Sequence, residues 1–201
     1  RHKHQWTPLH IAAERGHLSL CKYINKKYLN RCPDRPSDGL TPFYLAAQNG
    51  HRRVCKFLIS MLKNGEVSLS IRNGVTPLHA AAMNGHVKVC QMIIDNIADK
   101  NPKDDNAWTP LHSAAKRGHL DVCRMIIVNI KDKNPADNYG ETPLHGAATA
   151  GHFEVCRLLL ENIIEKNPGT NYGWNWTPLH NAAHKNHVEI CKLFFEHVKD
   201  K

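Results

Sequence analysis

The sequence contains no apolar run long enough to span a membrane. Its longest unbroken apolar runs, such as residues 125–128, fall far short of the roughly 20 residues that cross a bilayer. The first residues, RHKHQWTP, lack the apolar stretch of a secretory signal. No phosphate-cradling glycine loop or clustered carboxylate site stands out either. We therefore expect no membrane insertion, no cofactor and no enzyme activity.

Acidic residues are scarce relative to basic ones. The chain has 18 Asp and Glu against 27 Lys and Arg, a net charge of +9, while its 41% hydrophobic content is ordinary for a folded soluble protein. The excess is uneven, because residues 1–36 carry +6 and residues 137–169 carry −3. This gradient favours a partner that is acidic near the N-terminal end. Nucleic acid is one alternative, although no nucleic-acid-binding motif is present.

A six-fold repeat organises the chain. Each copy contains a Thr-Pro pair, followed in five copies by Leu-His and nine residues after the Thr by Gly-His, or once by Asn-His. The steps between Thr-Pro pairs are 34, 35, 33, 33 and 35 residues. Self-similarity at this period indicates stacked units, each of which contacts only its neighbours. The pairs begin at Thr7, Thr41, Thr76, Thr109, Thr142 and Thr177.

Six of the seven cysteines follow the same register, 14 residues after each Thr. In GHLDVC, His119 and Cys123 have a spacing compatible with half of a zinc site or with a thiol and its base. A site that performs chemistry is normally built once, whereas a residue repeated six times belongs to the structural unit. We therefore expect these cysteines to be small buried hydrophobes.

Disulfides between these cysteines are not expected. Equivalent helices of stacked units lie roughly 8–10 Å apart, whereas a disulfide needs its Cα atoms within about 7 Å. Reduced thiols favour an intracellular location, in the cytoplasm or nucleus. Cys32 stands outside the register, and is either an exposed thiol or an ordinary loop residue.

Each unit is predicted to begin with a short helix. Thr109 is a typical N-cap, and Pro110 suits the first turn, where its missing N–H costs nothing. About two helical turns follow, with Leu111, Ala114 and Ala115 on the packing face. The small alanines allow neighbouring helices to approach closely.

A second helix and a turn complete the unit. Gly118 is expected to end the first helix in a left-handed conformation. The second helix should run from about Leu120 to Ile130, and its apolar stripe is too broad for a surface helix, so neighbours should cover it on both sides. Pro135 and the Asn, Asp and Gly residues around it predict a hairpin-like turn.

The residues TPLHSAAKRGHLDV, with their 33-residue step, resemble the ankyrin repeat. The resemblance covers essentially the whole chain, although three junctions carry Lys-Asn-Pro in place of the usual LLxxGADxN. It implies a mainly α ankyrin-repeat solenoid of helix-turn-helix units with projecting β-hairpin-like finger loops. It also implies a non-catalytic module that binds a protein or peptide on its concave face and fingers. The single domain, 1–201, would contain repeats at about 3–36, 37–71, 72–104, 105–137, 138–172 and 173–201.

Other roles stay open on the sequence alone. The array could be a structural spacer, or a regulatory or targeting domain of a larger multidomain protein. The last repeat keeps Phe194 and Phe195 where a capping repeat would be polar, so we expect a monomeric fragment of a longer protein. The histidines of the TPLH and GH motifs should make local hydrogen bonds that connect adjacent units, and no metal site is expected.

Partner binding should depend on residues that differ between repeats, and the aromatic residues of the fingers come first. Three tryptophans directly precede a Thr and are expected to pack against the hairpin. The fourth, Trp174, lies in NYGWNW, a finger two residues longer than its neighbours. Such amphipathic side chains are enriched at binding hot spots, although this finger could also pack on itself. The candidates are Trp108, Tyr139, Tyr172, Trp174 and Trp176.

The ends of the first helices supply a second set of candidates. The two residues before each Gly-His should face the concave side of the repeats. Lys116 and Arg117, near Trp108 in the sequence, either grip an acidic or phosphorylated segment or form a solvated helix face. The candidates are Glu14, Arg15, Met83, Asn84, Lys116, Arg117, His184 and Lys185.

Overall fold

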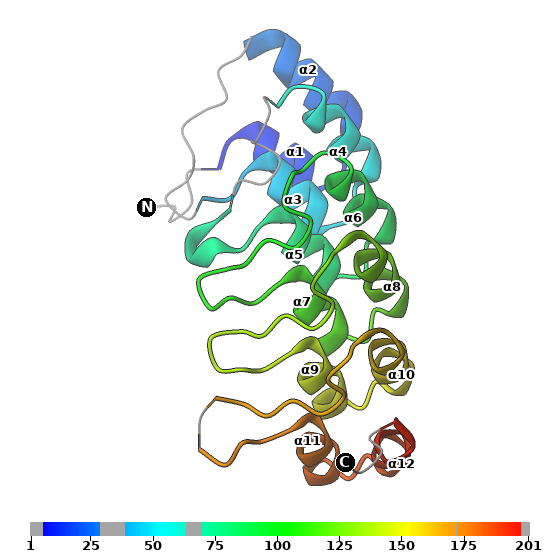
Figure 1. Cartoon of the computed structure of the whole chain (residues 1–201). Helices are drawn as coiled ribbons and strands as arrows, with labels where there is room; N and C mark the ends of the chain where they lie inside the picture. The colour runs from blue at the N-terminus through cyan, green and yellow to red at the C-terminus, as the bar shows by residue number, and fades with distance from the viewer. Residues whose placement is uncertain (1–5, 29–38, 63–69, 172, 198–201) are drawn as a thin grey trace. The chain divides into compact units, whose positions relative to one another are not determined.

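The computed structural model (Figure 1) describes residues 6–28, 39–62, 70–171 and 173–197. Within these ranges the chain forms helices and connecting loops, and no strand is present. The chain divides into two compact units, residues 1–99 (unit 1) and 100–201 (unit 2), which are described separately. Two residues singled out in the sequence, Cys32 and Tyr172, lie outside the described residues. The predicted mainly α repeat fold is confirmed.

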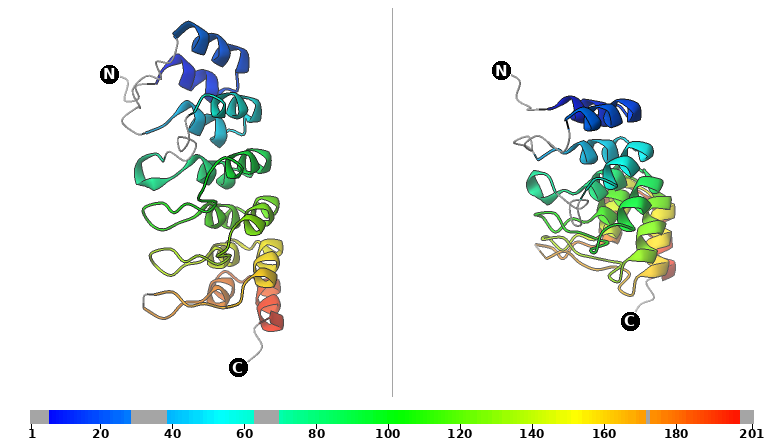
Figure 2. Two further views of the ribbon diagram at one scale, coloured as in Figure 1. Left: turned by 45° about the horizontal axis from the view of Figure 1, so that its top comes forward. Right: turned by 90° about the horizontal axis from the view of Figure 1, so that it is seen from above.

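Unit 1 contains three helix pairs, one in each of the first three predicted repeats. The first helices of the pairs pack against one another in a row, and the second helices form a parallel row beside them (Figures 1 and 2). A short 3₁₀ helix, η2 (Arg72–Gly74), precedes the third pair. The first helices are α1 (Pro8–Glu14), α3 (Pro42–Gln48) and α5 (Pro77–Met83), and the second helices are α2 (Leu18–Tyr28), α4 (Arg52–Ile59) and α6 (Val87–Ile94).

Unit 2 repeats this arrangement. Its first and second helices form two rows, and the long loops that lead into the first helices project beyond them on one side (Figure 1). The first helices are α7 (Pro110–Lys116), α9 (Pro143–Ala150) and α11 (Pro178–His184), and the second helices are α8 (Leu120–Asn129), α10 (Phe153–Asn162) and α12 (Val188–His197).

Thr and His together fix the start of five of the six first helices, all except α3, where Tyr44 stands in place of the His. In α7 the Thr109 N–H donates to Nδ1 of His112 at 3.1 Å, and the His112 N–H donates to the Thr109 hydroxyl at 3.5 Å. This is a reciprocal capping box in which His replaces the usual Glu or Gln. The predicted packing face is confirmed, because Leu111, Ala114 and Ala115 are fully buried.

Glycine ends the first helix for two reasons. Gly118 has a φ of +76°, the left-handed conformation expected from the sequence, and the next N–H, of His119, donates to Ala114 O at 3.0 Å. In addition, a Cβ at Gly118 would lie 2.6 Å from the ring of His152, which belongs to the next repeat. Any side chain here would therefore push adjacent repeats apart.

Histidines of the TPLH and GH motifs connect neighbouring repeats, as predicted. The TPLH histidine donates from Nε2 to the carbonyl of the residue before the next Thr, as His145 does to Trp176 at 3.2 Å. The GH histidine donates to the end of the preceding first helix, as His152 does to Lys116 O at 3.2 Å. Equivalent bonds join His10 to Leu40, His112 to Glu141, His51 to Glu14, His86 to Gln48 and His187 to Thr149.

The second helices carry most of the large apolar side chains. Helix α8 ends at Asn129, one residue before the predicted end, because Ile130 adopts an extended conformation. Val122, Ile126 and Ile127 are buried between neighbours, as the broad apolar stripe predicted. In the last repeat Phe194 is fully buried, while Phe195 is exposed.

Candidate interaction surface

The finger loops of unit 2 are closed by short hydrogen-bonded turns. In the first, the Asp104 N–H donates to Trp108 O at 2.9 Å, and the Asp104 carboxylate accepts the Trp108 N–H at 2.9 Å. In the second, the Asp137 N–H and carboxylate make the same two bonds with Glu141, both at 2.9 Å. These bonds confirm the hairpin-like turns predicted from the Asn, Asp and Gly residues.

The third finger of unit 2 differs in its turn residue and in its length. Thr170 takes the place of Asp, and its hydroxyl accepts the Trp176 N–H at 3.1 Å. Gly173 and Asn175 both have positive φ, at 66° and 51°. Trp174 lies between them with 89% of its surface exposed. The alternative that this tryptophan packs on its own loop is therefore wrong.

Consecutive fingers in unit 2 are hydrogen-bonded to one another through the backbone. The Asn138 N–H donates to Asn106 O at 3.0 Å, and the Asn171 N–H donates to Tyr139 O at 2.9 Å. The Asn138 amide adds a bond to Asp105 O at 3.1 Å. Each finger therefore fixes the position of the next, and Tyr139 is presented from this bonded edge with 55% of its surface exposed.

Trp108 is held by side chains of the helix that it precedes. Its indole Nε1 donates to the Ser113 hydroxyl at 3.1 Å, and its ring lies 4.7 Å from the His112 ring. The Lys116 ammonium sits 5.3 Å from the centre of the indole, within the range of a cation–π interaction. Two predicted partner-binding residues, Trp108 and Lys116, are thus in contact, and the lysine remains exposed.

Trp176 has the same relation to α11. Its Nε1 donates to the Asn181 side-chain oxygen at 2.5 Å, and its ring lies 5.3 Å from His180 and 6.2 Å from His184. Packing of these tryptophans against the hairpin stays a prediction, and the ring contacts established for Trp108 and Trp176 are with the following helix. The reason is their place directly before the N-cap Thr, from which the ring reaches residues four and eight positions further along.

Two polar residues that hold the tryptophans were missed in the sequence analysis. Ser113 and Asn181 stand five residues after Trp108 and Trp176, at a variable position of the first helix. In the repeat between them a glutamate replaces the tryptophan, and glycine, Gly146, occupies the corresponding helix position. Because Ile11 stands five residues after Trp6, the sequence carries no consistent signal for this pairing.

The ends of the first helices are largely exposed. In unit 2, Arg117, His184 and Lys185 are exposed. In unit 1, Met83 and Asn84 are exposed, and the amide of Asn84 donates to Ala80 O at 2.9 Å. At the first repeat, Arg15 is exposed and lies 3.9 Å from the carboxylate of the half-buried Glu14. Their role in binding stays a prediction.

Burial shifts the pKa of one carboxyl group and one imidazole of unit 2. The pKa of Glu141 is raised by burial and by the Asp137 charge, and Lys116 opposes the rise. The pKa of His145 is lowered, chiefly by burial, although its hydrogen bond to Trp176 O opposes the shift. Because Nδ1 accepts the Thr142 N–H while Nε2 donates, His145 is the neutral Nε2-protonated imidazole.

The register cysteines are poorly suited to nucleophilic chemistry. Cys123 is fully buried, and burial raises the pKa of its thiol to about 12, so the reactive thiolate is suppressed. The same value holds for Cys55, Cys90 and Cys156. Five of the six register cysteines are buried, which confirms the prediction that they are small buried side chains of the framework, and none of the six is joined in a disulfide in the part of the chain that the structure describes.

No group of three or more His, Cys, Asp or Glu side chains in the described ranges is placed to hold a metal ion. No helix in these ranges has both the length and the apolar character needed to cross a bilayer.

Comparison with known proteins identifies repeats over nearly the whole chain. A family model described as Ankyrin repeats (3 copies) matches residues 1–71, 60–137 and 78–171. A second model, described as Ankyrin repeat, matches residues 174–199. No curated protein matches the chain.

Proposed function

The chain belongs to the ankyrin repeat family, whose repeats are generally protein-interaction modules, and we propose that it binds a protein or peptide partner without catalysing a reaction. The proposed surface consists of the finger loops and the exposed ends of the first helices, taken within each unit. Repeated units of this kind add surface as they stack instead of enclosing a pocket. An open surface suits a protein face or extended peptide better than a metabolite.

The observation that carries this proposal is the exposure of Trp174. A tryptophan with 89% of its surface in solvent contributes little to the stability of its own loop. On contact with a partner it would remove a large apolar area from water, which is why tryptophan dominates binding hot spots. The bonded fingers hold their positions before binding, so little conformational entropy is lost.

The partner would present acidic or phosphorylated groups to the basic ends of the first helices. In unit 2 these are Lys116 and Arg117, both exposed, and in unit 1 the corresponding residue is Arg15. Charge-assisted hydrogen bonds from Arg to carboxylate or phosphate are stronger than neutral ones. Arg15 would contribute to a preference for acidic partners near the N-terminal end.

The state of the cysteines supports an intracellular location, in the cytoplasm or nucleus. Six free thiols in register, five of them buried, suit a reducing compartment.

A spacer role would need no exposed aromatic fingertip, so it is the outcome expected if the binding experiment fails.

The experiment compares two triple variants of the whole chain. The first replaces Trp174, Lys116 and Arg117 with Ala. The matched control replaces one exposed aromatic and two exposed basic residues that lie away from this surface: Phe195, Arg124 and Lys131. Both are checked for wild-type thermal unfolding, then used to capture proteins from nuclease-treated lysate of the source cells at physiological salt.

The proposal predicts a partner that the wild type and the control retain and the first variant loses. Retention after nuclease treatment would exclude a nucleic-acid bridge, since phosphate-driven binding also falls steeply with salt. If all three proteins capture the same set, or none captures anything, the surface is wrong and the spacer or multidomain-fragment role moves ahead.

A further inference from the structure

The second helices of unit 1 carry positive charge and no negative charge. Helices α2, α4 and α6 contain no Asp or Glu between their first and last residues. The nearest acid, Asp95, follows α6 and accepts a hydrogen bond from Gln91 at 2.8 Å. The basic residues, all exposed, are Lys22, Lys26, Lys27, Arg52, Arg53, Lys56 and Lys88, called here the basic face.

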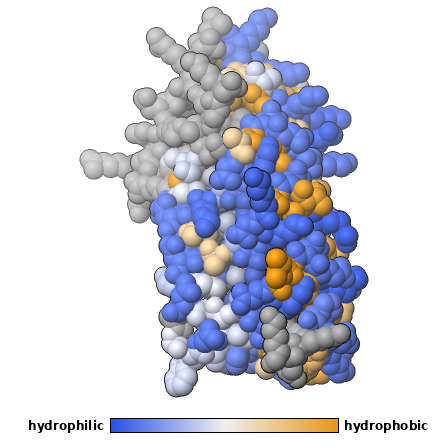
Figure 3. Space-filling model, viewed as in Figure 1, coloured by the Kyte–Doolittle hydropathy of each residue, from blue (hydrophilic) through white to orange (hydrophobic). Residues whose placement is uncertain are grey.

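These seven side chains belong to neighbouring helices. Helix α4 packs against both α2 and α6, so the three helices lie side by side, and this part of the surface is largely hydrophilic in Figure 3. At roughly 8–10 Å between packed helices, the basic face extends about 16–20 Å across its rows. Within the described ranges none of the seven forms an ion pair. Three of the basic residues that make residues 1–36 positive, Lys22, Lys26 and Lys27, belong to this face.

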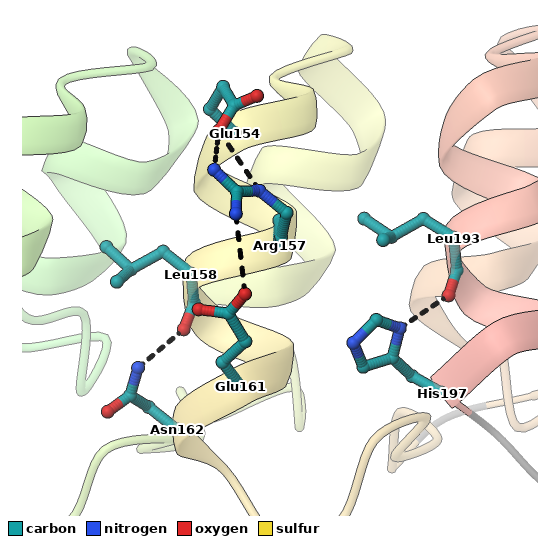
Figure 4. Close-up of polar contacts among 7 residues, drawn as sticks. All are labelled: Glu154, Arg157, Leu158, Glu161, Asn162, Leu193 and His197. Atoms are coloured by element: carbon teal, nitrogen blue, oxygen red, sulfur yellow. Dashed lines mark hydrogen bonds and ion pairs between the residues drawn. The ribbon is translucent and has the colours of Figure 1, made fainter.

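Unit 2 shows that the repeat does not require such a face. Each second helix of unit 2 carries an acidic residue two positions before the register cysteine and a basic residue one position after it. The two are three residues apart and therefore lie on one side of the helix. Arg157 lies 2.5 Å from Glu154 and 3.6 Å from Glu161, and Lys192 lies 2.8 Å from Glu189 (Figure 4 shows the Arg157 cluster).

At the same positions unit 1 omits the acid. The residues two before the cysteines are Ser19, Arg53 and Lys88, where unit 2 has only Asp or Glu. Like charges four residues apart, such as Lys22 with Lys26, destabilise a helix. An external negative surface would remove this repulsion.

Exposed apolar side chains lie among these charges. On α2, Leu20 is 44% exposed and Tyr23 is 64% exposed, one turn apart and beside Lys22 and Lys27. A phosphate backbone offers no favourable environment for leucine. The boundary between lipid headgroups and acyl chains does, and tyrosine is enriched at that boundary because it has an apolar ring and a polar tip.

We propose that the basic face adsorbs peripherally to an anionic bilayer, with lipid headgroups against the seven cations and with Leu20 and Tyr23 at the acyl boundary. A bilayer is a plane of negative charge, so it can meet three helices at once, whereas an extended peptide follows a single row. The inference does not depend on the proposed protein-binding function.

The test measures co-sedimentation of the whole chain with vesicles. One set contains equal parts phosphatidylserine and phosphatidylcholine, and the other contains phosphatidylcholine alone. The face variant is Arg53→Glu with Lys88→Glu, which installs the acids found in unit 2. The matched control is Arg124→Glu with Lys192→Glu on the second helices of unit 2, and it changes the net charge equally. A third variant, Leu20→Ser with Tyr23→Ser, keeps every charge. All must unfold at the wild-type temperature.

The wild type should sediment with the anionic vesicles and not with the neutral ones. Each basic residue near an anionic membrane strengthens binding about fivefold, so the face variant should bind at least about 25-fold more weakly. The control variant should bind the anionic vesicles nearly as strongly as the wild type does. The apolar variant should lose vesicle binding but keep its affinity for polyglutamate, which has no acyl boundary.

Three results would overturn the proposal. The first is that the wild type does not sediment with anionic vesicles at low salt. The second is that the control variant and the face variant lose vesicle binding equally. The third is an apolar variant that binds vesicles as well as the wild type does. If the face variant loses binding to polyglutamate or duplex DNA while no protein binds vesicles, the basic face belongs to an acidic protein or to nucleic acid.

Discussion

Replacing His145 with alanine should destabilise unit 2 more than replacing the equivalent histidine of the last repeat. His145 is fully buried and uses both ring nitrogens. Its Nδ1 accepts the Thr142 N–H at 3.0 Å, and its Nε2 donates to Trp176 O at 3.2 Å in the next repeat. Alanine removes both bonds and leaves a space that is too small and enclosed for the backbone groups to be fully hydrated.

The magnitude follows from the groups that lose their partners. A buried donor or acceptor left without a hydrogen bond costs about 1–3 kcal/mol, so the two together cost about 2–6 kcal/mol. His180 makes the corresponding bond to the Thr177 N–H, at 3.2 Å, but its ring is exposed, and no bond from its Nε2 is found among the described residues. His180→Ala should cost only a cap, about 0.5–2 kcal/mol.

Equilibrium unfolding in urea, followed by circular dichroism, measures both free energies. The reasoning requires His145→Ala to lose about 1–3 kcal/mol more than His180→Ala, the difference expected from the one bond between repeats. Equal losses in the two variants would refute it, because the TPLH histidine would then act only as a local cap. Comparable slopes of free energy against urea are needed for the comparison.

Three further predictions concern acid, the thiols and the glycines. Because burial lowers the pKa of His145, the unfolded chain binds its proton first, so the unfolding free energy should fall as the pH drops below about 6.5, and less steeply in His145→Gln. Cys123→Ser should lower the unfolding free energy by about 1–3 kcal/mol, because it buries a hydroxyl group. In the wild type a thiol reagent should label Cys123 only when the protein unfolds, since the pKa of this thiol is about 12. Rapid labelling of the native protein would contradict this. Gly151 has a φ of +79°, and a Cβ there would lie 2.7 Å from the His187 ring, so Gly151→Ala should lower the unfolding free energy measured in urea by more than the roughly 1–2 kcal/mol of the left-handed backbone alone. Gly173 has a φ of +66° and open space around it, so Gly173→Ala should lower this free energy much less.

The repeat framework was predictable because its determinants are local and occur six times. Thr109 caps α7, Gly118 ends it, and Cys123 is buried, each at the place that the pattern indicated. Contacts three or four residues apart follow from helix geometry alone, and repetition separates framework residues from functional candidates. The bonds of the GH and TPLH histidines to adjacent repeats were also expected, and they are confirmed.

Properties that depend on contacts between elements were less accessible. The tryptophans before Thr were expected on the hairpin, and the contacts established for Trp108 are with Ser113 and Lys116 of the following helix. The basic face was visible only as a net charge, because the sequence does not show which basic side chains of α2, α4 and α6 stay exposed once these helices pack side by side.

The sequence by itself determined the family, the register of the helices and the residues that could vary without breaking a repeat. Only the tertiary structure decided which of those variable side chains are used internally and which face solvent. Trp108 and Trp174 illustrate the difference, because one is bound to a helix through its indole N–H and the other is almost fully exposed. The physical reason is that exposure and charge pairing depend on which residues lie opposite in neighbouring repeats, and a one-dimensional pattern does not specify those distances.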